Sequence, residues 1–127
     1  MIICIEFGFG PASRAVNCRG GQARYCITRR PGMSVDEFSR YWREVHGPIG
    51  RRIPGLRRLV QSHPIPDPDQ MGPPTFDGMA ELWFDDLAAL RTARHSAEWK
   101  ASSEDEANFV DETRTALFLT EEHEIER

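Results

Sequence analysis

Two histidines and one glutamate stand where side chains could move protons. His46 ends the stretch WREVHGP, directly before a Gly-Pro pair, and His63 precedes a proline-rich segment. With an ordinary pKa of about 6.5, imidazole is the side chain best suited to acid–base work near neutral pH. Glu81 lies within the apolar stretch AELWF, where a buried carboxylate needs a partner. The surroundings of these three residues decide what chemistry the chain can perform.

Each of them also has a purely structural explanation. His46 can cap a helix by bonding to a carbonyl of the last turn, and the residues alone favour that role. Burial would lower the pKa of His46, while the negative end of a helix would raise it. His63 either faces a pocket or caps a sheet edge. Glu81 is either a pocket acid or the ion-pair partner of Arg24 or Arg58, and the ion pair is favoured.

The fingerprints of the common cofactor and metal sites do not occur in the sequence. It contains no H-E-x-x-H, G-x-S-x-G, P-loop or G-x-G-x-x-G pattern. Cys4, Cys18 and Cys26 fit no zinc spacing, and we expect free thiols. We therefore expect no cofactor and no metal; a haem held by a single histidine is the weaker alternative.

The most clearly predicted element is a helix that starts at Ser34. Ser34 and Glu37 form the S-x-x-E capping box. An apolar stripe follows at spacings of four, three and four residues: Phe38, Trp42, Val45 and Ile49. His46 comes four residues after Trp42, so it lies beside this stripe and can face the core. Pro48 cannot donate to the preceding turn, and we expect the freed carbonyl to hold the imidazole in one tautomer.

The remaining patterns complete the order β-α-β-β-α-β. Alternating or apolar stretches predict strands over 23–30, 56–64, 79–84 and 114–125, and a loop over 64–76. Asp85 is expected to cap a helix that continues to Trp99, and a second capping box, Ser103 to Glu106, to start a short turn. The order predicts an α+β fold, the ferredoxin-like plait: a four-stranded antiparallel sheet with both helices on one face. Trp83 or Phe118 would leave the other face apolar, and we expect a homodimer through the sheet faces.

Composition and charge narrow the function classes. The 127 residues suit one domain, with residues 1–22 as a loosely ordered extension and 23–127 as the folded part. No apolar stretch is long enough for a bilayer, so we expect a cytoplasmic protein and no membrane. Residues 1–62 carry a net charge of +7 and residues 63–127 carry −11. We expect the two halves to face each other. The overall charge of −4 and the lack of an aromatic RNP motif argue against nucleic acid.

Several motifs in order resemble the EthD family of dimeric α+β barrel proteins. They are RRPGMSVDEFSRYWREVHGP, PGLRRLVQSHP, FDGMAELWFDDLAAL, DEANFVD and FLTEEHEI. The resemblance extends from Ala23 to Ile125 and leaves the N-terminal segment uncovered. The family is named for a locus needed to degrade a fuel ether beside a cytochrome P450 system. Related proteins include fungal dehydratases of polyketide tailoring.

The resemblance implies a pocket in each subunit between the sheet and its helices. His46 and His63 both match the family's pattern, and the resemblance makes His46 the leading pocket residue rather than a cap. Phe38, Trp42 and Phe109 would line an apolar pocket. Tyr41 could reach the pocket's edge, although half-buried packing is favoured for it.

From these features we expect a small cofactor-independent enzyme that acts on a hydrophobic oxygenated molecule. His46, assisted by His63, would transfer protons in a dehydration, isomerisation or cyclisation. The alternatives are an accessory protein or oxygenase in an oxidative pathway, and a non-catalytic module that binds a small molecule. The fold alone does not choose among them.

Overall fold

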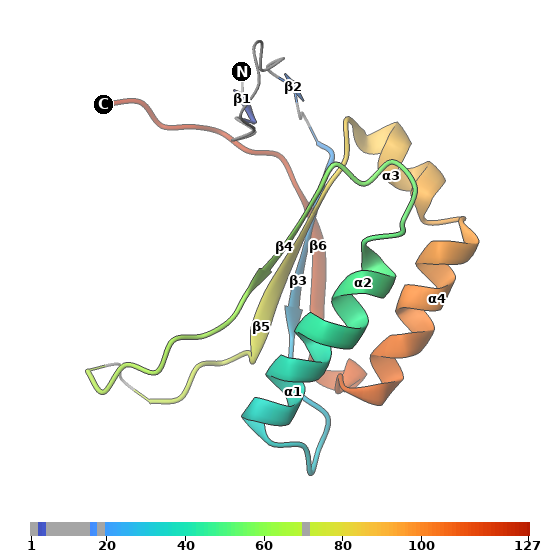
Figure 1. Cartoon of the computed structure of the whole chain (residues 1–127). Coiled ribbons are helices and arrows are strands. Elements are labelled where there is room, and N and C mark those ends of the chain that lie inside the picture. The colour runs from blue at the N-terminus through green and yellow to red at the C-terminus, as the bar shows by residue number, and fades with distance from the viewer. Residues whose placement is uncertain (1–2, 5–15, 18–19, 70–71) are drawn as a thin grey trace.

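The described part of the chain folds as a four-stranded antiparallel sheet with its helices on one face. The computed structural model describes residues 3–4, 16–17, 20–69 and 72–127. The sheet has the strand order β4-β5-β3-β6, and the helices form a layer against one side of it (Figure 1). The four strands are β3 (Gln22–Ile27), β4 (Arg58–Ser62), β5 (Gly78–Trp83) and β6 (Ala116–Thr120). This arrangement confirms the predicted ferredoxin-like plait.

The first helical segment is continuous but changes its hydrogen bonding along its length. Its three parts are α1 (Val35–Tyr41), the π-helical turn η1 (Trp42–His46) and α2 (Gly47–Gly50). The predicted capping box is confirmed: Ser34 Oγ accepts from the Glu37 N–H, and the Glu37 carboxylate accepts from the Ser34 N–H.

The second helical segment differs from the prediction. It is split into α3 (Leu87–Ala93) and α4 (Ala97–Asp105), followed by the short 3-10 turns η2 (Glu106–Asn108) and η3 (Glu112–Arg114). Asp86, and not Asp85, caps α3, because its carboxylate accepts from the Ala89 N–H. Ser96 starts α4 by accepting from the Trp99 N–H, which breaks the expected single helix.

The prediction of a second capping box, at Ser103 and Glu106, was also wrong. Ser103 lies inside α4, and Glu106 begins η2. The S-x-x-E spacing there is a coincidence of two polar residues in a helix that Ser96 had already started.

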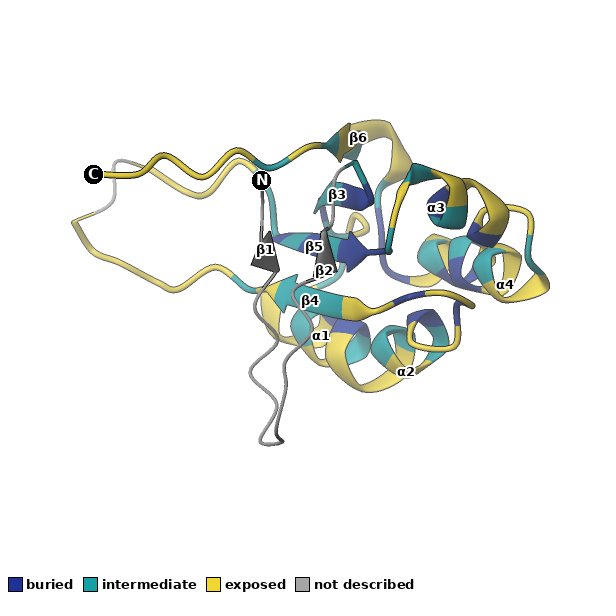
Figure 2. Ribbon diagram, turned by 90° about the horizontal axis from the view of Figure 1, so that it is seen from above, coloured by how far each residue is buried: buried dark blue, intermediate teal, exposed yellow. Residues whose placement is uncertain are grey.

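The core lies between the inner face of the sheet and the helices. Alternation along β5 sends Ala80 and Leu82 to this core, and Phe84 follows them just after the strand. Buried residues concentrate on the central strands and on the helix sides that face them (Figure 2). The loop between β4 and β5 carries no regular element in its described residues and projects away from the sheet (Figure 1), as expected.

The N-terminal segment is described only in part. The strands β1 (Ile3–Cys4) and β2 (Val16–Asn17) pair antiparallel. Most of residues 1–22 lie outside the described residues, so the loosely ordered extension stays a prediction. Gln22, the last residue of that predicted extension, belongs to β3 and is buried.

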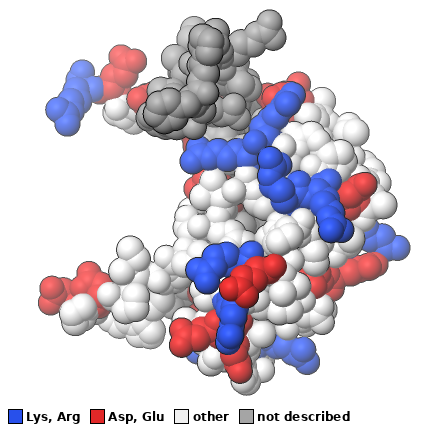
Figure 3. All heavy atoms as spheres, viewed as in Figure 1, with Lys and Arg blue, Asp and Glu red and all other residues white. Residues whose placement is uncertain are grey.

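The two oppositely charged halves of the sequence meet within this one chain. Four ion pairs join an arginine of the first half to an acid of the second: Arg24–Glu81 at 2.7 Å, Arg24–Glu122 at 2.8 Å, Arg29–Asp77 at 2.7 Å and Arg57–Asp85 at 2.7 Å. Basic and acidic side chains both occur on the face shown in Figure 3. The charge asymmetry along the sequence therefore needs no nucleic-acid partner to explain it.

Candidate functional site

A narrow cavity lies between the sheet and the helices η1, α2 and α4. Apolar side chains form most of its wall: Ile27, Trp42, Ile53, Leu59, Leu82, Trp99 and Phe109. The polar groups facing it include His46, Gln61, Ser102 and Glu106. The cavity volume is about 50 Å³. The cavity suits a small apolar ligand with a few polar contacts.

The π-helical turn that carries His46 follows from the Gly-Pro pair behind it. Pro48 has no N–H to give to the preceding turn. The Gly47 N–H instead bonds to the Trp42 carbonyl, five residues earlier. Such single π-turns are frequent at functional sites, because they re-aim side chains within a helix.

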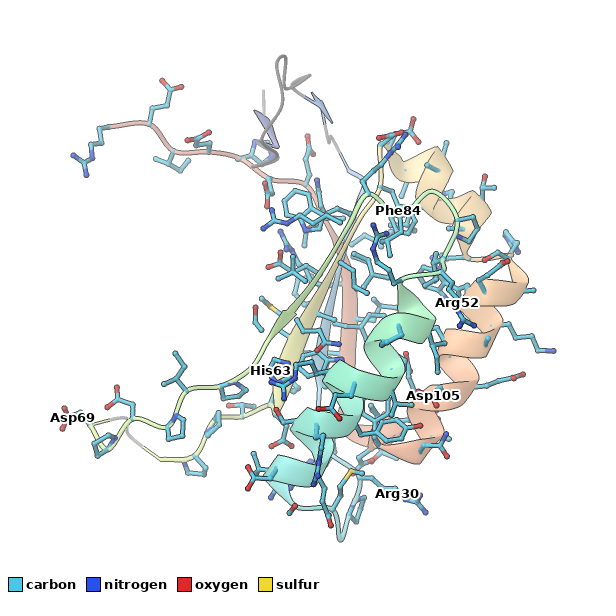
Figure 4. All side chains as sticks on the ribbon, viewed as in Figure 1. Arg30, Arg52, His63, Asp69, Phe84 and Asp105 are labelled. Carbon is cyan, nitrogen blue, oxygen red and sulfur yellow. The ribbon has the colours of Figure 1, made fainter. Side chains whose placement is uncertain are left out.

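Asp105 holds the His46 ring in place. The Nδ1 atom of His46 lies 2.8 Å from Oδ2 of Asp105, at the end of α4 (Figure 4). An ionised carboxylate only accepts hydrogen bonds, so Nδ1 carries the proton. Nε2 of His46 then has a free lone pair and no hydrogen-bond partner within the described residues. A carbonyl freed by Pro48 was expected to fix this tautomer, but the carboxylate of Asp105 fixes it instead.

Asp105 is itself held by three donors. Its Oδ1 accepts from the Tyr41 hydroxyl at 2.6 Å and from Asn108 Nδ2 at 3.1 Å. Burial acts to raise the pKa of Asp105, but the hydrogen bonds from Tyr41, His46 and Asn108 outweigh it and leave the pKa below its usual value. Asp105 is therefore ionised at neutral pH. The hydrogen bond to Asp105, with burial, raises the pKa of Tyr41, so its hydroxyl stays protonated.

His46 is neutral at the same pH. Burial lowers its pKa and outweighs the hydrogen bond and the negative charge of Asp105, which act to raise it. The ring packs on Phe109, with centroids 4.7 Å apart. A neutral imidazole with an oriented Nδ1–H and an unpaired Nε2 in an apolar cavity can accept a proton.

A domain pattern and one solved structure show which family the chain belongs to. The EthD domain pattern matches residues 30–113 of the chain. The chain belongs to the EthD family. It is similar to an EthD-family protein from Bacillus halodurans, with 28% identity and a TM-score of 0.67 over 81% of this chain and 99% of that one. No curated protein matches the chain.

Two further solved structures support the fold of this EthD protein. A dimeric protein of unknown function with a ferredoxin-like fold from Bacteroides fragilis has 14% identity and a TM-score of 0.56, covering 79% of this chain and 93% of its own. A dimeric ferredoxin-like protein from Thermobifida fusca has 10% identity and a TM-score of 0.58, covering 83% and 92%. Identities this low support the fold alone.

The aromatic residues expected to bind a ligand have different places in the EthD domain. Trp42 and Phe109 line the cavity, while Phe38 is packed behind them in the core, with its ring 5.8 Å from Trp42 and 5.6 Å from Phe109. Tyr41 packs on Phe109 and reaches the site only through Asp105. Gly78 of β5 leaves the space that the Trp42 ring fills, because a Cβ there would overlap it.

His63 lies outside this cavity, on the other side of Trp42. Its ring packs on Trp42 at 4.5 Å, at the end of β4 (Figure 4). Gln61 Nε2 donates to the Trp42 carbonyl, so the Gln61 Oε1 must accept from His63 Nε2–H, and Ser39 Oγ donates to His63 Nδ1 at 2.7 Å. This fully bonded chain fixes the tautomer of His63. His46 and His63 therefore do not face one space.

Glu81 lies on the opposite face of the sheet. Its carboxylate pairs with Arg24 at 2.7 Å and accepts from the Trp83 indole N–H at 3.2 Å. The guanidinium groups of Arg24 and Arg58 lie over the Trp83 ring. The ion-pair explanation of Glu81 thus fits its position, and it is not near His46.

Asp105, Glu106 and Gln61 were not predicted as site residues from the sequence. Asp105 and Glu106 stand in the run SSEDEANF, which has the composition of a solvated helix end. Only the placement of α4 against η1 reveals them, since Asp105 is 59 residues from His46. Gln61 offered a weak signal, because it shares a strand face with His63.

The described residues offer no ready metal site and no membrane span. They contain no group of three or more His, Cys, Asp or Glu side chains that could hold an ion. None of the helices in the described ranges is long and apolar enough to cross a bilayer.

Proposed function

We propose that this EthD protein is a small cofactor-independent enzyme that transfers protons on a small, apolar, oxygenated molecule. The supporting observation is the His46–Asp105 pair at the wall of a mostly apolar cavity. The carboxylate orients the ring and stabilises the imidazolium that forms when Nε2 takes a proton. A positioned base of this kind contributes about 10²–10⁴-fold to a reaction rate.

The reaction class follows from the groups available. An oriented base in an apolar wall suits removal of a proton from carbon, as in dehydration, isomerisation or cyclisation. His63 lies outside the cavity, so we assign it a positioning role: through Gln61 it helps to hold the Trp42 backbone.

The test begins with the molecule that the protein carries. Native mass spectrometry of freshly purified protein identifies a co-purifying small molecule, and an absorbance scan reports haem or flavin. The wild type, His46→Ala and His46→Gln are then compared for affinity and turnover of that molecule, with the exposed His95→Gln as the matched control. We expect turnover to fall about 10²-fold or more in both His46 variants, with the control unchanged. Turnover that survives both changes would refute the proposal.

A non-catalytic binding module is the second candidate. The observation that favours it is the largely apolar lining, which binds a hydrophobic molecule without any proton transfer. Its signature would be a bound molecule that the wild type never converts and that the His46 variants still bind.

We further propose a homodimer formed through the outer faces of the sheets. Two similar structures are of dimeric proteins. Phe118 stands on this outer face with 52% of its surface exposed. An exposed aromatic side chain on an uncovered sheet face is typical of an interface.

A further inference from the structure

A second titratable group, Glu106, faces the cavity that His46 lines. Glu106 begins η2, directly after Asp105 at the end of α4. Its backbone carbonyl accepts from the N–H groups of Phe109 and Val110 at 3.1 and 2.8 Å, which fixes the turn. Its carboxyl group has no hydrogen bond and no ion pair within the described residues.

The charged groups around Glu106 are mostly negative. Besides burial, the negative charges of Glu112 and Asp105 raise the pKa of Glu106. The negative charge of Glu106 in turn adds to burial in raising the pKa of the Tyr25 hydroxyl. The positive charge of Arg94 acts to lower the pKa of Tyr25, but within the described residues Arg94 forms no ion pair with Glu106. Burial, followed by Glu112 and Asp105, raises the pKa of Glu106 to about 7. At pH 7, about half of the molecules therefore carry Glu106 as a neutral carboxylic acid.

Neighbouring carboxyl groups thus have opposite states. Asp105 has three donors and is ionised at neutral pH, whereas Glu106 has none and loses its proton only as the pH rises through about 7. Environments that push the pKa values of adjacent groups apart separate acid from base. His46, held by the first carboxyl group, is the base, and the second carboxyl group is free to donate.

We propose that Glu106 is the proton donor of this site. His46 then acts as the base and Glu106 as the acid on the same bound ligand, which carries a carbonyl group. The proposal rests on the proposed function, since it requires His46 to act as the base. It adds a substrate class: an apolar ketone or aldehyde with a C–H bond next to the carbonyl.

The proton transfers balance without any further reagent. His46 Nε2 takes the proton from the carbon beside the carbonyl, and the electrons of that C–H bond form a C=C bond. The carbonyl π electrons take the proton of the Glu106 carboxylic acid, which leaves an enol, an imidazolium and a carboxylate. The enol then takes a proton from His46 at carbon and returns its O–H proton to Glu106. When the ligand has a C=C bond next to that carbon, the conjugated enol can take the proton at the far end of that bond instead, which isomerises the ligand. Return to the same carbon exchanges its hydrogen once the imidazolium N–H has exchanged with solvent.

The experiment uses cyclohexanone as the probe, because it is small, apolar and has exchangeable hydrogens beside the carbonyl. Its hydrogen–deuterium exchange in D₂O is followed by proton NMR with wild type, Glu106→Gln, His46→Gln and the exposed α4 control Glu104→Gln. We expect the wild type and the control to catalyse the exchange at equal rates. The exchange rate should fall about 10²-fold in His46→Gln and at least about 10-fold in Glu106→Gln. Cyclohexanone affinity should change less than about threefold in Glu106→Gln, because an amide has nearly the same shape.

Infrared difference spectra of the wild type supply a second readout that needs no substrate. The C=O band of a protonated carboxylic acid should fade with a midpoint near pH 7 and be missing in Glu106→Gln.

The outcomes separate the two proposals. The assignment of Glu106 is overturned if the exchange rate is unchanged in Glu106→Gln, or if the protonated-acid band persists in that variant. Neither result contradicts the role of His46 as the base. Exchange that survives in His46→Gln overturns the proposed function itself. A wild type that binds cyclohexanone without exchanging it, or that does not act on it at all, overturns the substrate class.

Discussion

His46 Nδ1 and Asp105 Oδ2 lie 2.8 Å apart, although the two residues are 59 positions apart in the chain. The contact joins the π-helical turn after α1 to the last residue of α4, so it exists only when both helices pack on the sheet. Because Asp105 also accepts from Tyr41 and Asn108, its position is set by three elements of the fold at once. The orientation of the imidazole is therefore a property of the folded domain rather than of one helix end.

Removing the charge of Asp105 should lower the pKa of His46 further. The hydrogen bond and negative charge of Asp105 act to raise that pKa against burial. An asparagine keeps the shape and can still accept from Nδ1–H, but it no longer stabilises the imidazolium. We expect Asp105→Asn to lower the His46 pKa below its wild-type value, measured by NMR titration of the ring protons. Glu104→Gln, on the exposed side of α4, should leave it unchanged; an upward shift in Asp105→Asn would show that Asp105 is not the ionised partner.

The stability of the protein should depend on pH through Glu106. Its folded-state pKa of about 7 lies above the ordinary glutamate value of about 4.3, so the folded state holds the proton more tightly. The stability this provides is fully present below about pH 4 and is lost as the pH rises through about 7. Glutamine does not titrate, so Glu106→Gln does not lose stability in this way. The difference in the free energy of unfolding, variant minus wild type, should therefore rise by about 2–3 kcal/mol between pH 4 and pH 8.

Urea unfolding of both proteins at the two pH values measures this difference. Glu104→Gln serves as the exposed control and should show no comparable trend. A Glu106→Gln variant whose relative stability is flat with pH would contradict the raised pKa of Glu106.

The pKa of His63 should respond to Arg43. Burial lowers the pKa of His63, and the positive charge of Arg43 lowers it further. We expect Arg43→Gln to raise the His63 pKa at low salt, with the difference shrinking as salt screens the charge. NMR titration measures it, and Arg40→Gln on the same helical segment is the matched control. A downward shift, or an equal shift in the control, would rule out Arg43 as the source.

Local signals in the sequence predicted most of the fold. The capping box at Ser34 was confirmed because it depends only on residues three positions apart. The strand predicted over 79–84 corresponds to β5 (Gly78–Trp83), because the side chains of a strand alternate between its two faces every two residues. The split between α3 and α4 was not predicted. It depends on one hydrogen bond, in which the Ser96 side chain accepts from the Trp99 N–H and starts a new helix, and average helix propensities do not include such a bond.

The site was predicted only in part, for a different physical reason. His46 could be named from its place behind Trp42, but its partner could not, because Asp105 meets it through the packing of α4 on η1. Glu106 resembles any surface acid in sequence, and only its place in the cavity wall distinguishes it. His63 and Glu81 were expected near the pocket, yet the ring of Trp42 separates the first from it and the sheet separates the second.

Gly78 should be required for the packing of Trp42. A methyl group at this position would overlap the Trp42 ring, which then has to move out of its buried place beside the cavity. We expect Gly78→Ala to lower the free energy of unfolding by about 1–3 kcal/mol and to shift the tryptophan fluorescence. Gly50→Ala is the control, because a Cβ there meets only ordinary contacts at 3.5 and 3.7 Å and helical alanine is favoured over glycine. A Gly78→Ala protein as stable as the Gly50→Ala control would contradict this packing.

A charge at Phe118 should prevent the proposed dimer. Phe118 projects from β6 beside Arg24 on the outer face of the sheet, and 52% of its surface is exposed. In a dimer an aspartate at this position would be buried against the partner without a dedicated partner cation, because Arg24 is already held by Glu81 and Glu122. Val35→Asp on α1, where Val35 is 53% exposed, changes the same kind of surface on the helix side.

Sedimentation velocity at micromolar concentration distinguishes the three proteins. We expect the wild type and Val35→Asp to sediment as dimers and Phe118→Asp as a 14.5 kDa monomer with the folded circular dichroism spectrum retained. A wild type that sediments as a monomer contradicts the dimer itself. A Phe118→Asp protein that stays dimeric places the interface elsewhere, since an unpaired buried carboxylate costs several kcal/mol and would dissociate a sheet-to-sheet dimer.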